Sequence, residues 1–150
     1  MKKAENSQKA EIRIYSTQHD ISEERVENIY TGEYRFLAGA HVITYEEFFQ
    51  NEGNLPVKST SLIKVGENYI HIAKKGAITT QMHFEPQKKY YGTYQTPFGS
   101  FDMAIDTEHV TSCWQEHEIS AKLQYFLSLN NCPVSKYTVQ IAIILGEISD

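Results

Sequence analysis

Hydrophobic and polar residues alternate most regularly between Gly76 and Thr107. The apolar positions are Ile78, Met82 and Phe84 in a first run and Phe101, Met103 and Ile105 in a second. This period of two predicts β-strands with one apolar face. The segment 96–99, Thr-Pro-Phe-Gly, predicts a turn because proline fixes φ and glycine accepts a positive φ. Three or four consecutive strands are therefore expected here.

The rest of the chain predicts further strands. They are expected at residues 11–18, 24–38, 41–48, 57–65, 68–74, 119–127 and 138–145. A polar segment is expected at 107–118, a loop at Asn51–Pro56 and a turn at Asn130–Pro133. Gly32, in the middle of a strand, predicts a bulge or a bend of the kind that closes a barrel. We expect residues 1–9 to form a flexible segment and residues 10–150 a single domain.

Nine or ten strands joined by short turns are typical of an antiparallel meander. An open sheet of this size would leave two exposed edges, which closure removes. The predicted fold class is therefore all-β, an antiparallel up-and-down barrel of roughly eight to ten strands, in preference to a sandwich. A barrel of this size is either filled by side chains or holds one small ligand.

Charge and cysteine content narrow the possible partners. The chain has 14 basic and 19 acidic residues, a net charge of −5, which disfavours a general nucleic-acid binder. Cys113 and Cys132 have neither zinc-type spacing nor a disulfide framework. The N-terminus lacks the apolar region of a secretory signal, and the longest apolar run, 141–145, is too short to span a bilayer. A cytoplasmic protein, as a monomer or a homodimer, is expected.

Several motifs together resemble a known family. They are Thr44-Tyr45-Glu46-Glu47, residues 59–65, Lys75-Gly76, Met82-His83-Phe84, the YxTPxG turn at 94–99 and Leu123-Gln124-Tyr125. From about residue 11 to residue 143, the chain resembles the YwiB-like family of uncharacterised bacterial proteins with a calycin-type β-barrel. The resemblance implies a barrel similar to those of lipocalins, and it implies no activity and no catalytic residues. Lys75 stands where the family pattern commonly has arginine, which argues against a bidentate oxyanion contact there.

Candidate polar chemistry is sparse. Glu46 and Glu47 point to opposite faces of their strand, so they cannot act as a carboxylate pair, but one of them can face the barrel interior. His71 and His83 would lie diagonally on one face if Ile70 pairs with Met82, and two imidazoles could then ligate a metal. Because the sequence indicates no third ligand, no metal site and no cofactor are assigned.

Two further groups of residues are candidate sites. The serines and threonine at 59–61 lack the glycine-flanked elbow of a hydrolase nucleophile. Tyrosines 90, 91 and 94 with lysines 88 and 89 form a basic aromatic cluster that could stack bases or sugars, although such residues more often cap a barrel rim. No catalytic constellation is evident, so an enzyme is not expected.

The leading functional hypothesis is a barrel that binds a small apolar or amphipathic molecule in its interior. Its polar contacts are expected from the candidate ligand-binding residues Tyr45, Glu47, Tyr94, Thr96 and Phe98. The alternative is a non-catalytic protein-interaction or structural module that acts through the barrel rim or an edge strand. Both hypotheses start from the fold, which by itself does not determine function.

Overall fold

The computed structural model describes residues 7–49 and 57–146, and these form ten β-strands. The strands are β1 (Gln8–Gln18), β2 (Val26–Leu37), β3 (Ala40–Phe49), β4 (Val57–Val65), β5 (Ile70–Gly76), β6 (Thr79–Phe84), β7 (Lys89–Thr96), β8 (Gly99–Gln115), β9 (Glu118–Leu129) and β10 (Cys132–Leu145). Each strand pairs with its neighbours in the sequence, and β1 pairs with β10, so the antiparallel sheet closes. The prediction of an all-β antiparallel barrel of eight to ten strands is confirmed.

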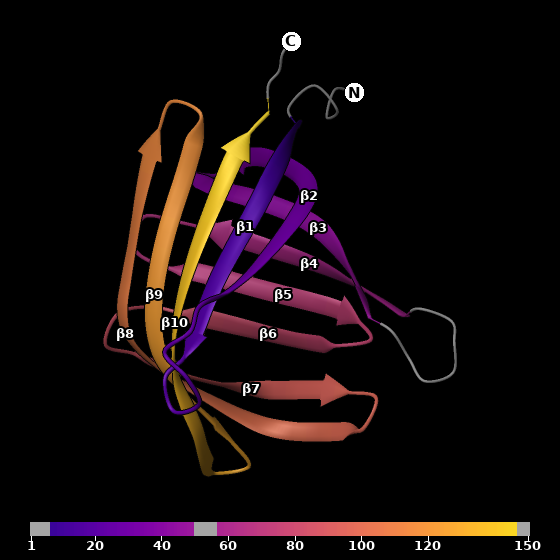
Figure 1. The fold of residues 1–150 in the computed structure, drawn as a ribbon, viewed down its shortest axis with the longest axis vertical. Helices are drawn as coiled ribbons and strands as arrows, with labels where there is room; N and C mark the ends of the chain where they lie inside the picture. The colour runs from indigo at the N-terminus through magenta and orange to yellow at the C-terminus, as the bar shows by residue number, and fades with distance from the viewer. Residues whose placement is uncertain (1–6, 50–56, 147–150) are drawn as a thin grey trace.

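The barrel is flattened into two layers. In Figure 1, β1, β8, β9 and β10 run steeply in one layer, and β3 to β6 cross behind them. Strands of two packed sheets that cross in this way require a strand that passes from one sheet to the other. β2 is such a strand, because its first part pairs with β1 and its last part pairs with β3.

Gly32 lies where β2 passes between the layers. It pairs with Ala10 of β1 on one side and with Tyr45 of β3 on the other. Neither pairing shows a register shift there, so Gly32 marks a bend and not a bulge. A Cβ at this position would collide with the backbone carbonyl oxygen of Thr44. Glycine is therefore required by close backbone approach.

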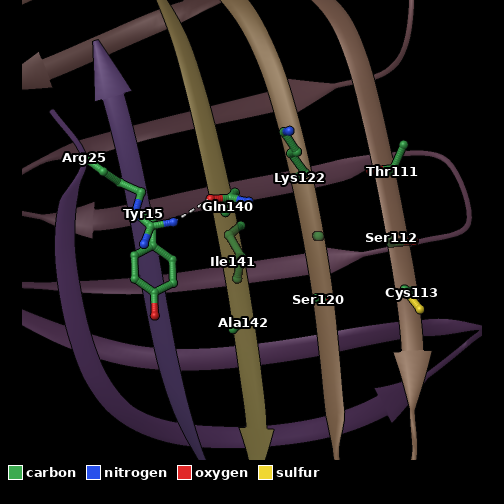
Figure 2. A pocket seen from close by; sticks show the side chains of 11 residues that line it. Tyr15, Arg25, Thr111, Ser112, Cys113, Ser120, Lys122, Gln140, Ile141 and Ala142 are labelled. Carbon is green, nitrogen blue, oxygen red and sulfur yellow. Dashed lines mark hydrogen bonds between the residues drawn. The ribbon is translucent and has the colours of Figure 1, made fainter. Parts of the chain in front are cut away.

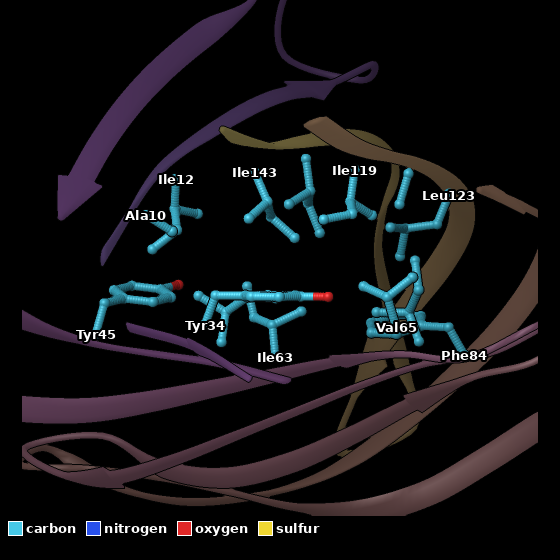
Figure 3. Close-up of a cluster of buried hydrophobic side chains, with 14 of the residues drawn as sticks. Ala10, Ile12, Tyr34, Tyr45, Ile63, Val65, Phe84, Ile119, Leu123 and Ile143 are labelled. Carbon is cyan, nitrogen blue, oxygen red and sulfur yellow. The ribbon is translucent and has the colours of Figure 1, made fainter. Parts of the chain in front are cut away.

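The inner faces of the two layers form one apolar core. Figure 3 shows Ile12, Ile119, Leu123 and Ile143 from one layer above Tyr34, Ile63, Val65 and Phe84 from the other. These side chains occupy alternate positions of their strands, as the period of two requires. Most are less than a few per cent exposed, which makes this core the main source of hydrophobic stabilisation.

Three predicted boundaries differ in the structure. The polar segment at 107–118 is mostly strand, because β8 continues to Gln115 beyond a register shift between Thr107 and His109. The turn expected at 130–133 is tighter: Asn130 and Asn131 adopt positive φ, and β10 starts at Cys132. β1 starts at Gln8, and the loop expected at 51–56 lies outside the described residues.

An aromatic group closes one end of the core. The hydroxyl of Tyr34 lies 2.9 Å from Nδ1 of the buried His41. The ring of Trp114 lies edge-on to His41 at 4.8 Å and stacks on Phe36 at 5.6 Å. Burial lowers the pKa of His41 below its ordinary value of 6.5. We call these four residues the aromatic cap.

Replacing Gly32 by alanine should destabilise the fold strongly. The added Cβ would force β2 away from β3, which we expect to lower the free energy of unfolding by about 2–3 kcal/mol. Urea denaturation followed by circular dichroism measures this loss. Thr31→Ala, at the adjacent exposed position, is the control and should cost less than about 1 kcal/mol. Equal losses in the two variants would contradict the close-approach role of Gly32.

The fluorescence of Trp114, the one tryptophan of the chain, should report the protonation of His41. A protonated imidazole quenches a neighbouring indole, so emission should fall as the pH decreases, with a midpoint below 6.5. Because the folded pKa is depressed, the stability contributed by neutral His41 is complete above pH 6.5 and is lost as the pH falls through the folded value. His41→Gln should abolish the transition. A midpoint at or above 6.5 would refute the assignment.

Candidate functional site

The strand register places a row of polar side chains inside the barrel. Tyr45 pairs with Ser61, Ser61 with Lys74, Lys74 with Thr80, and Thr80 with Tyr94. These five residues, which we call the polar belt, therefore follow one another across β3, β4, β5, β6 and β7. The neighbouring inward row, formed by Ile43, Ile63, Ile72 and Met82, is entirely apolar. The inner face of this layer thus changes from apolar to polar along its strands.

Glu47 is the centre of the hydrogen bonds at the belt. Lys74 Nζ donates to Glu47 Oε1 at 2.8 Å, and Ser61 Oγ donates to the same oxygen at 3.1 Å. Tyr30 donates its hydroxyl to Glu47 Oε2 at 3.1 Å. The side chains of Lys74 and Glu47 are only 17% and 13% exposed, so the ion pair is largely shielded from water. Each carboxylate oxygen has a donor, as a buried carboxylate requires.

The charge of Glu47 affects the tyrosines around it. Burial first, and then the charge and hydrogen bond of Glu47, raise the pKa of Tyr30 to about 12. The pKa of Tyr45 is also raised, by burial and then by Glu47, and its ring stacks on Tyr30 at 4.5 Å. Burial and Glu47 raise the pKa of Tyr94 as well. All three phenols are therefore neutral hydrogen-bonding groups at physiological pH.

An apolar cavity of about 310 Å³ adjoins the belt at Tyr94. It is lined by Met82, Tyr94, Met103, Tyr125, Leu127, Leu129, Val134 and Tyr137. Its lining thus combines thioether and aliphatic side chains with three tyrosines, a composition typical of small-molecule sites. The volume lies at the lower end of the range for such sites, which favours a small ligand.

Two buried hydroxyls lie on the strands next to the cavity. Thr107 Oγ1 and Ser135 Oγ find no hydrogen-bond partner among the described residues. Thr107 pairs with Tyr125 and Ser135 with Leu127, both of which line the cavity. Both also lie at register shifts, in β8 and β10 respectively. A buried hydroxyl without a hydrogen-bond partner costs free energy. The described residues therefore leave two hydroxyls near the cavity without hydrogen bonds.

A groove of about 400 Å³ on the outer face of β1, β8, β9 and β10 is an alternative site. Figure 2 shows Arg25 beside Tyr15, with its hydrogen bond to Gln140. The guanidinium lies 4.4 Å from the centre of the Tyr15 ring and 3.2 Å from Gln140 Oε1. Because Arg25 is already engaged in this way and the groove is open to solvent, we favour the interior site.

The structure brings together three of the five residues predicted to bind a ligand. Tyr45 stacks on Tyr30, and Glu47 accepts a hydrogen bond from Tyr30. Tyr94 belongs to the polar belt and lines the cavity. Thr96 instead stabilises the β7–β8 turn, where its Oγ1 accepts a hydrogen bond from the backbone N–H of Phe98 at 3.0 Å. Phe98 is 94% exposed. The turn is therefore separate from the Glu47 hydrogen bonds.

The sequence interpretation missed Lys74, Ser61 and Tyr30. Lys74 continues the inward-facing series that begins with Ile70 and Ile72, so its phase in the strand was the available signal. Ser61 alternates in the same way with Ile63 and Val65. A polar residue in the inward phase of an apolar strand indicates a site or a buried hydrogen bond, and here Lys74 and Ser61 hydrogen-bond to Glu47.

Two other interpretations need correction. Tyr91 is 70% exposed, whereas Tyr90 and Tyr94 pack against the core, so the tyrosines at 90, 91 and 94 do not form one stacking surface. The alternation of side chains along β7 separates them. The pairing of Ile70 with Met82 was also wrong: Ile70 pairs with Phe84, which places His71 directly opposite His83.

The proximity of Ser61 to Lys74 invites comparison with a serine–lysine catalytic dyad. Lys74 Nζ lies 3.2 Å from Ser61 Oγ, but it also donates to Glu47. Ser61 in turn donates to the carboxylate of Glu47. Lys74 acts as a donor in this arrangement, whereas a general base must accept the proton of the nucleophile. The hydrogen bonds therefore favour binding over nucleophilic catalysis.

The fold and the site define a closed, ten-stranded antiparallel barrel with an ion pair and an apolar cavity in its interior. The family described as "Domain of unknown function (DUF1934)" matches residues 11–141, and the chain belongs to this family. The crystal structure of the ywiB protein from Bacillus subtilis is similar in fold, with a TM-score of 0.73 and 15% sequence identity. The similarity covers 95% of this chain and 93% of that one.

These findings confirm the YwiB-like resemblance that the sequence motifs indicated. No curated protein matches the chain. Within residues 7–49 and 57–146, no helix is long and apolar enough to cross a membrane. The same residues contain no group of three or more histidine, cysteine, aspartate or glutamate side chains arranged to hold a metal ion.

Lys74→Met should destabilise the protein because it leaves the Glu47 carboxylate without its cation. We expect a loss of about 3 kcal/mol in the free energy of unfolding, measured by urea denaturation. The double variant Glu47→Gln/Lys74→Met should recover most of this loss, since the glutamine oxygen can accept from Ser61 while its NH2 group donates to the hydroxyl oxygen of Tyr30.

The exposed ion pair between Lys58 of β4 and Glu46 of β3 is a matched control on the outer face of the sheet. Its atoms are 3.3 Å apart and its side chains are 53% and 49% exposed. Lys58→Met should cost no more than about 0.5 kcal/mol. Equal losses for Lys58→Met and Lys74→Met would show that the shielding of the inner pair has no energetic consequence.

Proposed function

We propose that this protein binds a small amphipathic molecule inside the barrel. The apolar part of the ligand contacts Met103, Leu127 and the other side chains of the cavity. Its polar group lies at the belt, where Lys74 and Glu47 offer charges of both signs and the tyrosines offer hydroxyls. No catalytic step is part of this proposal.

The observation that carries the proposal is the junction of the cavity with the polar belt at Tyr94. The Tyr94 ring lines the cavity, and the charge of Glu47 contributes to the raised pKa of its hydroxyl. An apolar volume next to a few fixed polar groups suits a ligand that has both characters.

We further propose that the barrel is of the calycin type and that the protein is cytoplasmic. The calycin proposal rests on the closed antiparallel barrel, an analogy of fold. A cytoplasmic location is supported by Cys113 and Cys132, which are exposed and not joined in a disulfide.

The alternative function, a protein-interaction module, has one supporting observation. Phe36 and Trp114 of the aromatic cap are 46% and 60% exposed at the rim. Each described strand has a partner on both sides, so an edge strand could act only where β6 and β7 separate beyond their two paired positions, Thr79 with Gln95 and Thr80 with Tyr94. Under this alternative, a pull-down at mild salt should return a stable partner that the Trp114→Ala variant loses.

Native mass spectrometry of freshly purified protein is the first test of ligand binding. A reproducible extra mass that is lost on denaturation is the expected result. Octanoate and octylamine then serve as probes of opposite charge, titrated by calorimetry. Val134→Trp, at the edge of the cavity, should weaken binding of both probes by at least about tenfold. Phe126→Trp, at the exposed neighbour of Leu127, should leave binding unchanged.

The charge of the polar belt should set the preference between the probes. In Lys74→Met, the carboxylate of Glu47 loses its internal cation, so octylamine should bind more tightly and octanoate more weakly than in the wild type. Circular dichroism confirms that each variant is folded. The absence of any ligand or probe binding would reject the proposal, and so would a Val134→Trp variant that binds as well as the wild type.

A further inference from the structure

His71 and His83 face each other on the outer surface of β5 and β6. They form a directly opposite cross-strand pair, and their Nδ1 atoms lie 3.0 Å apart. Their neighbours in sequence, Ile70, Ile72, Met82 and Phe84, face the core, so the imidazoles lie on the opposite side of the sheet from the proposed ligand cavity. The pair is therefore independent of the proposed function.

Surrounding groups fix the orientation of the His83 ring. Its Nε2 lies 3.2 Å from Glu85 Oε1, and the other oxygen of Glu85 accepts a hydrogen bond from Lys88 at 3.2 Å. Tyr69 stacks on the ring at 5.4 Å, and Tyr90 lies 6.2 Å away. A carboxylate that accepts the Nε2 proton leaves Nδ1 with a free lone pair, which is the arrangement of metal-ligating histidines.

His71 is suited to the same role. Burial, followed by the neighbouring His83, lowers its pKa below 6.5, while a hydrogen bond with Gln81 opposes this shift and Lys64 adds slightly to it. The Nδ1 atom of His71 lies 3.0 Å from Nδ1 of His83, and neutral imidazole is the form that binds metals. With the proton of His83 on Nε2, a proton on Nδ1 of His71 would form the hydrogen bond between the rings.

The separation of the two nitrogens matches a chelate. Metal–nitrogen bonds of about 2.0–2.1 Å at angles between square-planar and tetrahedral place two ligating nitrogens about 2.9–3.3 Å apart. The observed 3.0 Å lies in this range and nearer to the square-planar value. A metal ion could thus bind both Nδ1 atoms with little movement of either ring, once the proton on Nδ1 of His71 has moved to its Nε2.

We propose that His71 and His83 form a two-histidine site for a divalent first-row transition metal, with Cu²⁺ bound most tightly. Glu85 acts as a positioning residue that holds the His83 ring. Two imidazole ligands leave the remaining coordination positions to solvent. The preference for Cu²⁺ follows from the general order of affinities for nitrogen ligands and from the near-square-planar spacing.

The test uses the full chain after treatment with a chelator. Calorimetry with Cu²⁺ and with Zn²⁺ should show one ion per chain, with Cu²⁺ the tighter. His71→Gln and His83→Gln should each weaken binding by at least about tenfold, and Glu85→Gln by about tenfold. His109→Gln, at an exposed histidine of β8, is the matched control and should bind like the wild type.

Electron paramagnetic resonance of the Cu²⁺ complex gives a readout on the unaltered protein. Hyperfine coupling to two equivalent nitrogens is expected in the wild type and in His109→Gln, and coupling to one nitrogen in His71→Gln. Binding that is the same in all variants would mean scattered surface coordination and would overturn the proposal. A wild-type spectrum without two coupled nitrogens would overturn it as well.

Discussion

The inward or outward phase of each strand is the constraint on which the rest of the structure depends. In a closed antiparallel sheet, every second side chain faces the interior, and a slip of one residue would exchange the two faces of a strand. In β5, this phase directs Ile70, Ile72 and Lys74 inward and His71 outward. The same rule therefore produces the core, the polar belt and the histidine pair.

Burying an ion pair inside a barrel costs desolvation free energy. Moving two charges out of water is often repaid only partly by their attraction, and apolar residues of similar size are frequently as stable. In this barrel, Glu47 uses both of its oxygens and accepts from Lys74, Ser61 and Tyr30. Such a complete set of donors offsets part of the cost of burying the pair.

Most of the fold could be predicted from the sequence, whereas only part of the site could. The alternation of apolar and polar residues predicted most of the strands, and their number predicted closure. The part of β8 beyond Thr107 was predicted as a polar segment because its residues are mostly polar, but pairing with β9 keeps it in the sheet. The sequence predicts that one of Glu46 and Glu47 faces the interior, and Tyr45 and Glu47 were among the predicted ligand-binding residues, but which face of their strand is inside does not follow from its pattern. Lys74 was not predicted, because its meeting with Glu47 depends on the register of three strands, which no local pattern specifies. To predict that His71 pairs with His83, only the register of the β5–β6 hairpin is needed.

The two ends of the interior differ in a way that bears on how a ligand would enter. At one end, His41, Val65, Ile70 and Phe84 form a continuous buried row, and Trp114 and Phe36 cover it. Four residues further along the same strands, the row becomes polar at Tyr45, Ser61, Lys74 and Thr80. A ligand that entered past the aromatic cap would have to displace tightly packed side chains, which close-packed interiors resist. Entry from the side of the cavity would disturb only the less buried Leu129, Val134 and Tyr137, so the packing gradient of the barrel favours that route.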